Sequence, residues 1–109
     1  MVILVTAKVV KKNDKYLSFE CSGHAGYARR GKDIICSAIS MLSYNCANSI
    51  MALTQSEIEV CENDGFISWE FKNDIDDKAS LLMDSLLIGL RSIMEDYDNK
   101  YLTLIIEEV

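Results

Sequence analysis

The fold is decided by the stretch Asp33-Ile-Ile-Cys-Ser-Ala-Ile-Ser-Met-Leu-Ser-Tyr-Asn-Cys-Ala-Asn-Ser-Ile-Met-Ala-Leu53. Its apolar residues recur at spacings of three and four, which is the period of a helix with one buried face: Ile35, Ile39, Leu42, Cys46, Ile50 and Leu53. A stripe of small and polar residues lies beside them: Cys36, Ser40, Ser43 and Ala47. Asp33 is a suitable N-cap. We therefore predict a helix from Asp33 to about Leu53.

The segments on either side of this helix alternate in the manner of strands. We predict strands over residues 2–10, 16–22, 57–61, 66–72 and 101–107, and a second helix that starts near Asp74. In the second strand, Leu17, Phe19 and Cys21 are expected on one face, with Tyr16 on the other. The order is ββαββαβ, which predicts an α/β fold: a single-layer sheet of about five strands with two helices packed on it.

Composition places the chain among ordinary globular proteins. Its 109 residues suit one domain, 1–109. The net charge of −6 argues against direct nucleic-acid binding, which needs a cationic surface. No stretch is recognised as a membrane span or signal peptide, so we expect a cytoplasmic protein with four reduced cysteines. We expect no cofactor, no metal and no membrane partner.

The segment between the second strand and the first helix carries the candidate chemistry. Its three glycines predict a loop from Gly23 to Lys32. The chain has one histidine, His24, on a glycine-flanked turn. If Asp33 caps the helix, Cys36 is the third helical residue, beside unpaired backbone N–H groups and the positive end of the helix dipole.

Cys36 and His24 together have the elements of a nucleophilic site. A helix N-terminus and a neighbouring imidazolium favour the thiolate form of a cysteine. A thiolate can attack a carbonyl, and a histidine can protonate the leaving amine. The amides of the first helical turn could bind the oxyanion. These residues predict acyl transfer by a Cys–His pair.

Other interpretations stay open on the residues alone. Cys21 and His24 have ligand-like spacing, and with Cys36 they could bind zinc. The basic run within Tyr27–Lys32 could instead dock the protein on a partner, as in a non-catalytic ribosome-associated module. Cys36 could also be a small packing residue.

The segment from Gly23 to Ser40 resembles the signature of the bacterial ribosomal-processing cysteine proteases, the Prp family. The resemblance rests on Gly23-His-Ala-Gly-Tyr-Ala28 followed by Gly31-Lys-Asp-Ile-Ile-Cys-Ser-Ala-Ile-Ser40. It extends over the whole chain in length and element order. Ser37 stands where alanine is frequent in the family.

The resemblance implies an endopeptidase whose catalytic pair is His24 and Cys36. Its substrate would be the precursor of large-subunit ribosomal protein twenty-seven, cut after an extended segment that ends in paired aromatic residues. The resemblance also implies a homodimer and a substrate loop with Tyr27, Arg29, Arg30 and Lys32. We expect supporting roles for Asp33 as helix cap and possible histidine orienter, for Ser40 beneath the site, and for Gly23 and Gly31 in turning the backbone.

Overall fold

The structure is a computed structural model of the whole chain, and it describes residues 5–23, 30–63, 65–97 and 101–109, with residues 30–33 described in backbone alone. The elements follow one another as ββαββαβ. Their bounds are β1 Val5–Lys12, β2 Lys15–Ser22, α1 Arg30–Leu53, β3 Ile58–Asn63, β4 Phe66–Phe71, α2 Asp77–Asp96 and β5 Leu102–Glu108. The predicted order of elements is confirmed.

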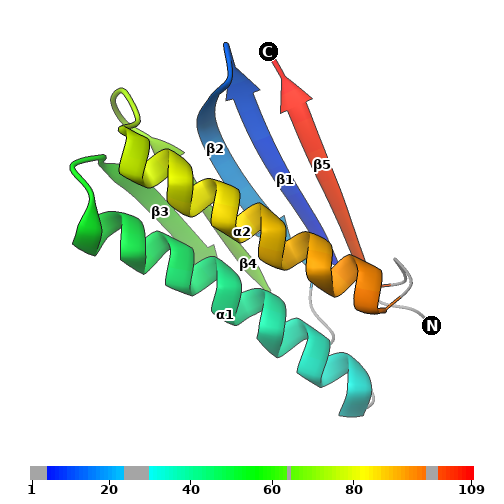
Figure 1. Cartoon of the computed structure of the whole chain (residues 1–109). Helices are drawn as coiled ribbons and strands as arrows, with labels where there is room; N and C mark the ends of the chain where they lie inside the picture. Colours follow the sequence, from blue (N-terminus) through cyan, green and yellow to red (C-terminus); the bar gives the residue numbers. More distant parts are fainter. Residues whose placement is uncertain (1–4, 24–29, 64, 98–100) are drawn as a thin grey trace.

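The five strands form one sheet with the order β3-β4-β2-β1-β5. Neighbouring strands are antiparallel except for β1 and β5, which are parallel, so the sheet is mixed. Both helices lie against the same face of the sheet, with α1 and α2 in contact along their length (Figure 1). The predicted architecture of one sheet layer and two packed helices is confirmed.

The two faces of the sheet differ in polarity. Along β1, Val5, Ala7 and Val9 point toward the helices and are buried. The opposite face carries polar side chains, among them Lys8, whose Nζ lies 2.8 Å from the Glu107 carboxylate. Hydrogen bonding to Glu107 raises the pKa of Lys8. This alternation is typical of a sheet that is covered on one side only.

A β-bulge in the first hairpin reverses one predicted orientation. Val10 pairs with Ser18 and Lys11 pairs with Tyr16, which leaves Leu17 without a partner in β1. The extra residue shifts the alternation by one position. Tyr16 is therefore 4% exposed and Leu17 is 39% exposed. The prediction that Leu17 shares the buried face with Phe19 is wrong for this reason.

Tyr16 anchors α2 to this end of the sheet. Its hydroxyl donates a hydrogen bond to the Asp84 carboxylate on α2. Lys11 Nζ lies 4.8 Å from the centre of the Tyr16 ring. Burial, followed by the hydrogen bond to Asp84, raises the pKa of Tyr16. The buried phenol thus has a partner for its polar atom, as a buried hydroxyl requires.

The core lies between the helices and the sheet. Phe19 and Trp69, on neighbouring strands, have ring centroids 4.7 Å apart. The largest fully buried side chains come from both layers: Trp69, Phe19, Ile39, Ile50, Met83 and Leu90. Leu53, predicted in the buried stripe, is 65% exposed because it is the last residue of α1, where the chain leaves the sheet.

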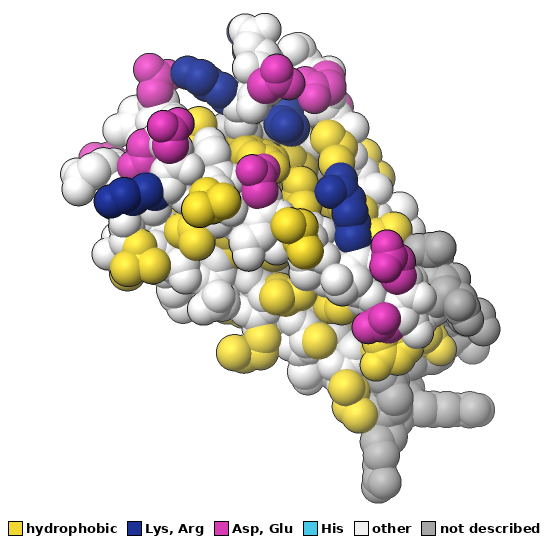
Figure 2. All heavy atoms as spheres, in the orientation of Figure 1, with side chains coloured by type: hydrophobic (Ala, Val, Ile, Leu, Met, Phe, Trp, Pro, Cys, Tyr) yellow, Lys and Arg dark blue, Asp and Glu magenta, His cyan; other side chains and the backbone are white. Residues whose placement is uncertain are grey.

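Helix α1 is unusually apolar. By length and composition alone its segment Ile34–Leu53, with a mean hydropathy of 1.3, is long and apolar enough to cross a membrane, contrary to the expectation from sequence. In the fold, its buried face packs on the sheet through Ile35, Ile39 and Ile50. Other apolar side chains remain exposed over the helix layer, as Figure 2 shows.

Helix α2 begins at Asp77, three residues after the predicted start near Asp74, and Asp76 is its N-cap. Asp76 Oδ1 accepts a hydrogen bond from the Ala79 N–H at 2.8 Å, and Oδ2 accepts one from the Gln55 N–H at 2.9 Å. The backbone N–H of Asp76 donates to Ser56 Oγ at 2.8 Å. The bonds from Ala79 and Gln55 lower the pKa of Asp76.

We expect Asp76→Asn to destabilise the protein in a pH-dependent way. An amide oxygen can accept only one of the two backbone bonds. Because the pKa of the folded-state carboxyl is below its ordinary value of 3.8, its stabilisation is present above that value and is lost as pH falls through the lowered pKa. The stability difference in urea unfolding should be larger at pH 7 than at pH 2.5. An equal difference at both pH values would contradict this account.

We expect Leu90→Ala to lower the free energy of unfolding by about 2–5 kcal/mol, because it leaves a cavity in a fully buried part of the core. The matched control is Leu53→Ala at the end of α1, since Leu53 is 65% exposed. That control should change stability by less than about 0.5 kcal/mol. Urea denaturation of both variants checks the prediction, and equal losses would contradict the packing described here.

Candidate active site

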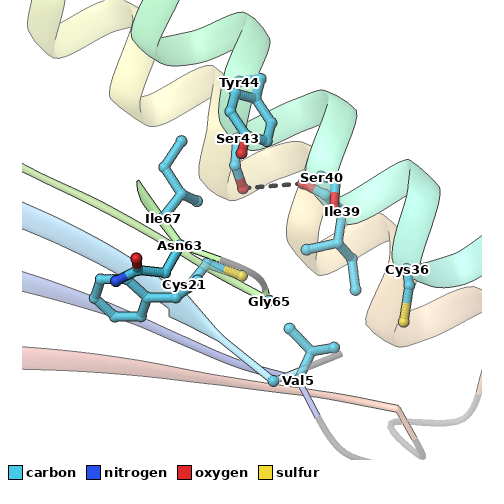
Figure 3. A pocket seen from close by; sticks show the side chains of 12 residues that line it. Val5, Cys21, Cys36, Ile39, Ser40, Ser43, Tyr44, Asn63, Gly65 and Ile67 are labelled. Atoms are coloured by element: carbon cyan, nitrogen blue, oxygen red, sulfur yellow. Dashed lines mark hydrogen bonds between the residues drawn. The ribbon is translucent and has the colours of Figure 1, made fainter. Parts of the chain in front are cut away.

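One cavity of about 230 Å³ brings together residues that are far apart in the sequence. One wall is α1, the floor is the end of β2 with the start of β1, and the other wall is the tip of the β3–β4 hairpin (Figure 3). The lining residues are Val5, Cys21, Gly23, Cys36, Ile39, Ser40, Ser43, Tyr44, Asn63, Gly65, Phe66 and Ile67. The cavity therefore joins the predicted nucleophile to segments that sequence reasoning did not connect with it.

Cys36 is placed on α1 at the edge of this cavity. Its side chain is partly buried and packs against the core cluster. Ser40, one helical turn further on, also lines the cavity and is exposed. The two residues share one side of the helix because residues four apart lie one above the other.

The predicted start of α1 is wrong. The helix begins at Arg30 rather than after Asp33, so Asp33 is not the N-cap and Cys36 lies in the second turn. Arginine and lysine favour helix, and a packed helix readily extends by a turn through one glycine. The backbone N–H of a second-turn residue donates a hydrogen bond within the helix. The unpaired N–H groups are therefore those of the first turn, and the N–H of Cys36 is not one of them.

The predicted loop residues fall into two groups. His24, Tyr27 and Arg29 lie outside the described residues. Arg30, Gly31 and Lys32 belong to the first turn of α1, so the loop predicted to run to Lys32 ends earlier.

Gly23, the last described residue before His24, holds the end of β2 against the hairpin tip. Its φ of 101° is a left-handed conformation that favours glycine. Its N–H donates to the Gly65 carbonyl at 3.0 Å. Gly65, with a φ of 75°, stands at the β3–β4 connection, where the Asp-Gly pair predicted a tight turn. This hydrogen bond joins the end of β2, in the floor of the cavity, to the hairpin tip. It lies one residue before His24 in the sequence.

Cys21, at the other side of the cavity, is a buried thiol. Burial raises its pKa to about 11, and a hydrogen bond with Ser43 opposes this shift. The Ser43 hydroxyl itself is fully buried and donates to the Ile39 carbonyl at 2.9 Å. These features give Cys21 a structural role in the floor of the cavity and Ser43 a structural role in its α1 wall.

The two remaining cysteines lie outside the cavity lining. Burial raises the pKa of Cys46 to about 12, and its Sγ lies 3.6 Å from the Leu82 carbonyl oxygen. Cys61 is exposed on the edge strand β3.

The zinc interpretation requires Cys21, His24 and Cys36 together. Within the described part of the chain, no group of three histidine, cysteine, aspartate or glutamate side chains could hold a metal ion. His24 lies outside that part, so the described residues do not test this alternative to the expected absence of a metal.

The chain matches the family model of the cysteine protease Prp over residues 4–102. It is 31% identical over 108 residues to the ribosomal processing cysteine protease Prp of Bacillus subtilis, covering 92% of this chain and 96% of the relative. The Staphylococcus aureus protein of the same name is 30% identical over 78 residues, covering 70% and 74% of the two chains.

Solved structures share the fold. The crystal structure of the ribosomal processing protease Prp from S. aureus with a substrate peptide matches with a TM-score of 0.86 at 23% identity, covering 95% of this chain and 100% of that one. A Streptococcus mutans protein matches with a TM-score of 0.82 at 27% identity, covering 97% and 96%. The class these comparisons define is that of the cysteine proteases. Within it, the chain belongs to the Prp family of ribosomal processing proteases.

We expect iodoacetamide to modify the native protein at Cys36 and Cys61 and to spare Cys21 and Cys46. The last two are buried, and their raised pKa values leave little thiolate at pH 8. Peptide mapping by mass spectrometry measures the result. In denaturant all four thiols should react. Labelling of native Cys21 or Cys46 as fast as Cys61 would contradict the assignment.

Proposed function

We propose that this protein is a cysteine endopeptidase that removes the N-terminal extension of large-subunit ribosomal protein twenty-seven, with Cys36 as nucleophile and His24 as general acid and base. The observation that carries the proposal is the position of Cys36. Its thiol is partly buried on the wall of a cavity that Gly23 also lines, and His24 directly follows Gly23 in the chain. The names of the relatives support processing of a ribosomal protein.

The chemistry follows from the two side chains. The thiolate of Cys36 attacks the scissile carbonyl carbon, and the carbonyl electrons move to oxygen. The oxyanion then collapses, and the bond to the amine breaks as His24 donates a proton to the nitrogen. Water, deprotonated by His24, hydrolyses the thioester and regenerates the thiol.

The surroundings of Cys36 suit this attack. A helical side chain leans toward the N-terminus of its helix, so the sulfur of a second-turn cysteine leans toward the first turn. The free N–H groups of that turn remain the proposed oxyanion donors. Ser40 lines the same cavity one helical turn after Cys36, and its proposed role is to support the site from beneath.

The charge of the protein supports a basic protein substrate. A net charge of −6 attracts cationic chains and speeds their encounter. Ribosomal proteins are mostly cationic because they bind RNA phosphates. The paired aromatic residues of the proposed cleavage segment would enter a cavity whose lining includes Ile39, Ile67 and Phe66.

A homodimer in the cytoplasm completes the proposal. Large apolar side chains remain exposed over the helix layer, including Ile34, Met41, Leu81 and Ile88, each at least 60% exposed. Contiguous exposed apolar surface is typical of protein interfaces. A second copy that covers this layer would leave the cavity beside the N-terminal half of α1 accessible to a substrate.

We expect Cys36→Ala and His24→Ala each to lower cleavage of a peptide that spans the extension by at least about a thousandfold, because each removes one half of the catalytic pair. Cleavage is followed by mass spectrometry, with thermal unfolding as a check on folding. The matched control is Cys61→Ala, which should cleave at the wild-type rate.

Retained cleavage in either variant would overturn the assignment of that residue. A wild-type protein that binds ribosomal particles, is insensitive to alkylation and cleaves nothing would instead be a docking module.

A further inference from the structure

A second cavity lies at the other end of the β1–β2 hairpin. Its volume is about 320 Å³, against about 230 Å³ for the cavity beside Cys36, and no described residue lines both. Lys11, near the end of β1, lines the second cavity, and Val5, at the start of β1, lines the first. Six residues of strand span about 20 Å. The second cavity is therefore separate from the candidate active site.

This cavity forms where α2 and the edge strand β5 diverge. The two elements separate toward the end of β5 in Figure 1. On the helix side of β5, the exposed fraction rises from 2% at Leu102 to 41% at Ile106. Ile106 lines the cavity together with Leu87 and Ile88 of α2. These three side chains give the cavity an aliphatic lining.

Three charged side chains line the same cavity. Lys11 and Arg91 are cations, and Asp84 is an anion. The Asp84 carboxylate accepts a hydrogen bond from the Tyr16 hydroxyl. Lys11 Nζ instead lies over the Tyr16 ring, 4.8 Å from its centre. The carboxylate in the cavity is thus held by the phenol and not by the two cations.

Neither cation is neutralised by a neighbouring carboxylate. Among the described residues, the only ion pair within 4 Å joins Lys8 to Glu107. Glu108 is the neighbour of Lys11 in the β1–β5 register, yet it does not line the cavity and forms no such pair. The described lining therefore keeps one positive charge in excess, in a chain whose net charge is −6.

We propose that this cavity binds a monocarboxylate with an aliphatic body. One negative charge balances the excess charge of the lining, whereas a dianion would leave a second negative charge close to Asp84. A guanidinium binds a carboxylate through two parallel N–H···O hydrogen bonds, and Arg91 supplies that group here. The aliphatic body packs on Leu87, Ile88 and Ile106.

The size of the cavity suits such a ligand. Pockets for small molecules commonly measure about 300–1,000 Å³ and combine an apolar lining with a few polar groups. A free short-chain acid and the C-terminal residue of a polypeptide carry the same chemistry, and the experiment distinguishes these two sources. The proposal does not depend on the endopeptidase function.

The experiment titrates the full-length protein, labelled with ¹³C at its leucine and isoleucine methyl groups, with hexanoate and with its neutral isostere hexanamide. The methyl shifts of Leu87 and Ile106 report binding, and the spectrum without ligand checks that each variant is folded. Lys11→Gln and Arg91→Gln each remove one cation. The matched control is Lys12→Gln, which removes the same charge from the next residue of β1, outside the cavity lining.

We expect hexanoate to shift these methyl groups saturably, with a Kd on the order of 1 mM for a ligand of this size. Hexanamide should bind about fivefold more weakly, because it lacks the charge. Lys11→Gln and Arg91→Gln should each weaken hexanoate binding about fivefold and leave hexanamide binding unchanged. Lys12→Gln should behave as the wild type. Arg91→Glu should prefer hexylammonium to hexanoate.

The peptide acetyl-Ala-Leu-Val, with a free C-terminal carboxylate, identifies the source of the ligand. Tighter binding of this peptide than of hexanoate, lost in its C-terminal amide, would assign the cavity to a polypeptide C-terminus, and tighter binding of hexanoate would assign it to a free acid. Equal affinity for hexanoate and hexanamide, equal weakening by Lys11→Gln and Lys12→Gln, or no saturable shift with either acid would overturn the proposal.

Discussion

The antiparallel pairing of β2 with β4 is the constraint on which the site depends. It places Phe19 against Trp69 and Cys21 against Ile67 in the middle of the sheet. Because the register is fixed there by large buried side chains, the ends of the two strands meet as well. Gly23 then bonds Gly65, and the hairpin tip becomes a wall of the cavity opposite α1. Without this pairing the segment before His24 would have no fixed relation to the helix that carries Cys36.

Hydrophobic periodicity was sufficient to predict the fold, because each element has one face to bury. The predictions from sequence were wrong where a single residue shifts the alternation of a strand or sets the end of a helix. Leu17 is apolar and continues the alternation with Phe19, yet it is the unpaired residue of a bulge. Nothing in the local pattern separates a bulged leucine from an inward-facing one. Likewise, Asp33 is as good a cap as Asp76, and only the backbone shows that α1 continues past it.

The candidate site could be predicted only in its local part. His24 and Cys36 lie twelve positions apart in one motif-bearing segment, so their types and spacing are visible in the sequence. Cys36 and Gly65 lie on different elements, and they line one cavity only because strand register and helix rotation bring them together. One signal was available: the Asp-Gly pair that ends in Gly65 predicts a tight turn. The turn is visible in the sequence, but its place beside α1 emerges only from the three-dimensional arrangement.

The rotation of α1 explains why Cys36, rather than another thiol, suits the role of nucleophile. Successive helical residues are about 100° apart around the axis. Ile35 is buried at 3% exposure, Ser37 is exposed, and Cys36 lies between them at the boundary of the core. A nucleophilic thiol needs a position of this kind, because a peptide must reach the sulfur while the core shields one side of the sulfur from water. Cys21 and Cys46 pack fully into the core, where burial favours the neutral thiol. Cys61 is exposed on an edge strand. Cys21 and Cys46 are too deeply buried, and Cys61 lies outside the cavity lining. The position of Cys36 relative to the core therefore makes it the thiol best placed to act as a nucleophile.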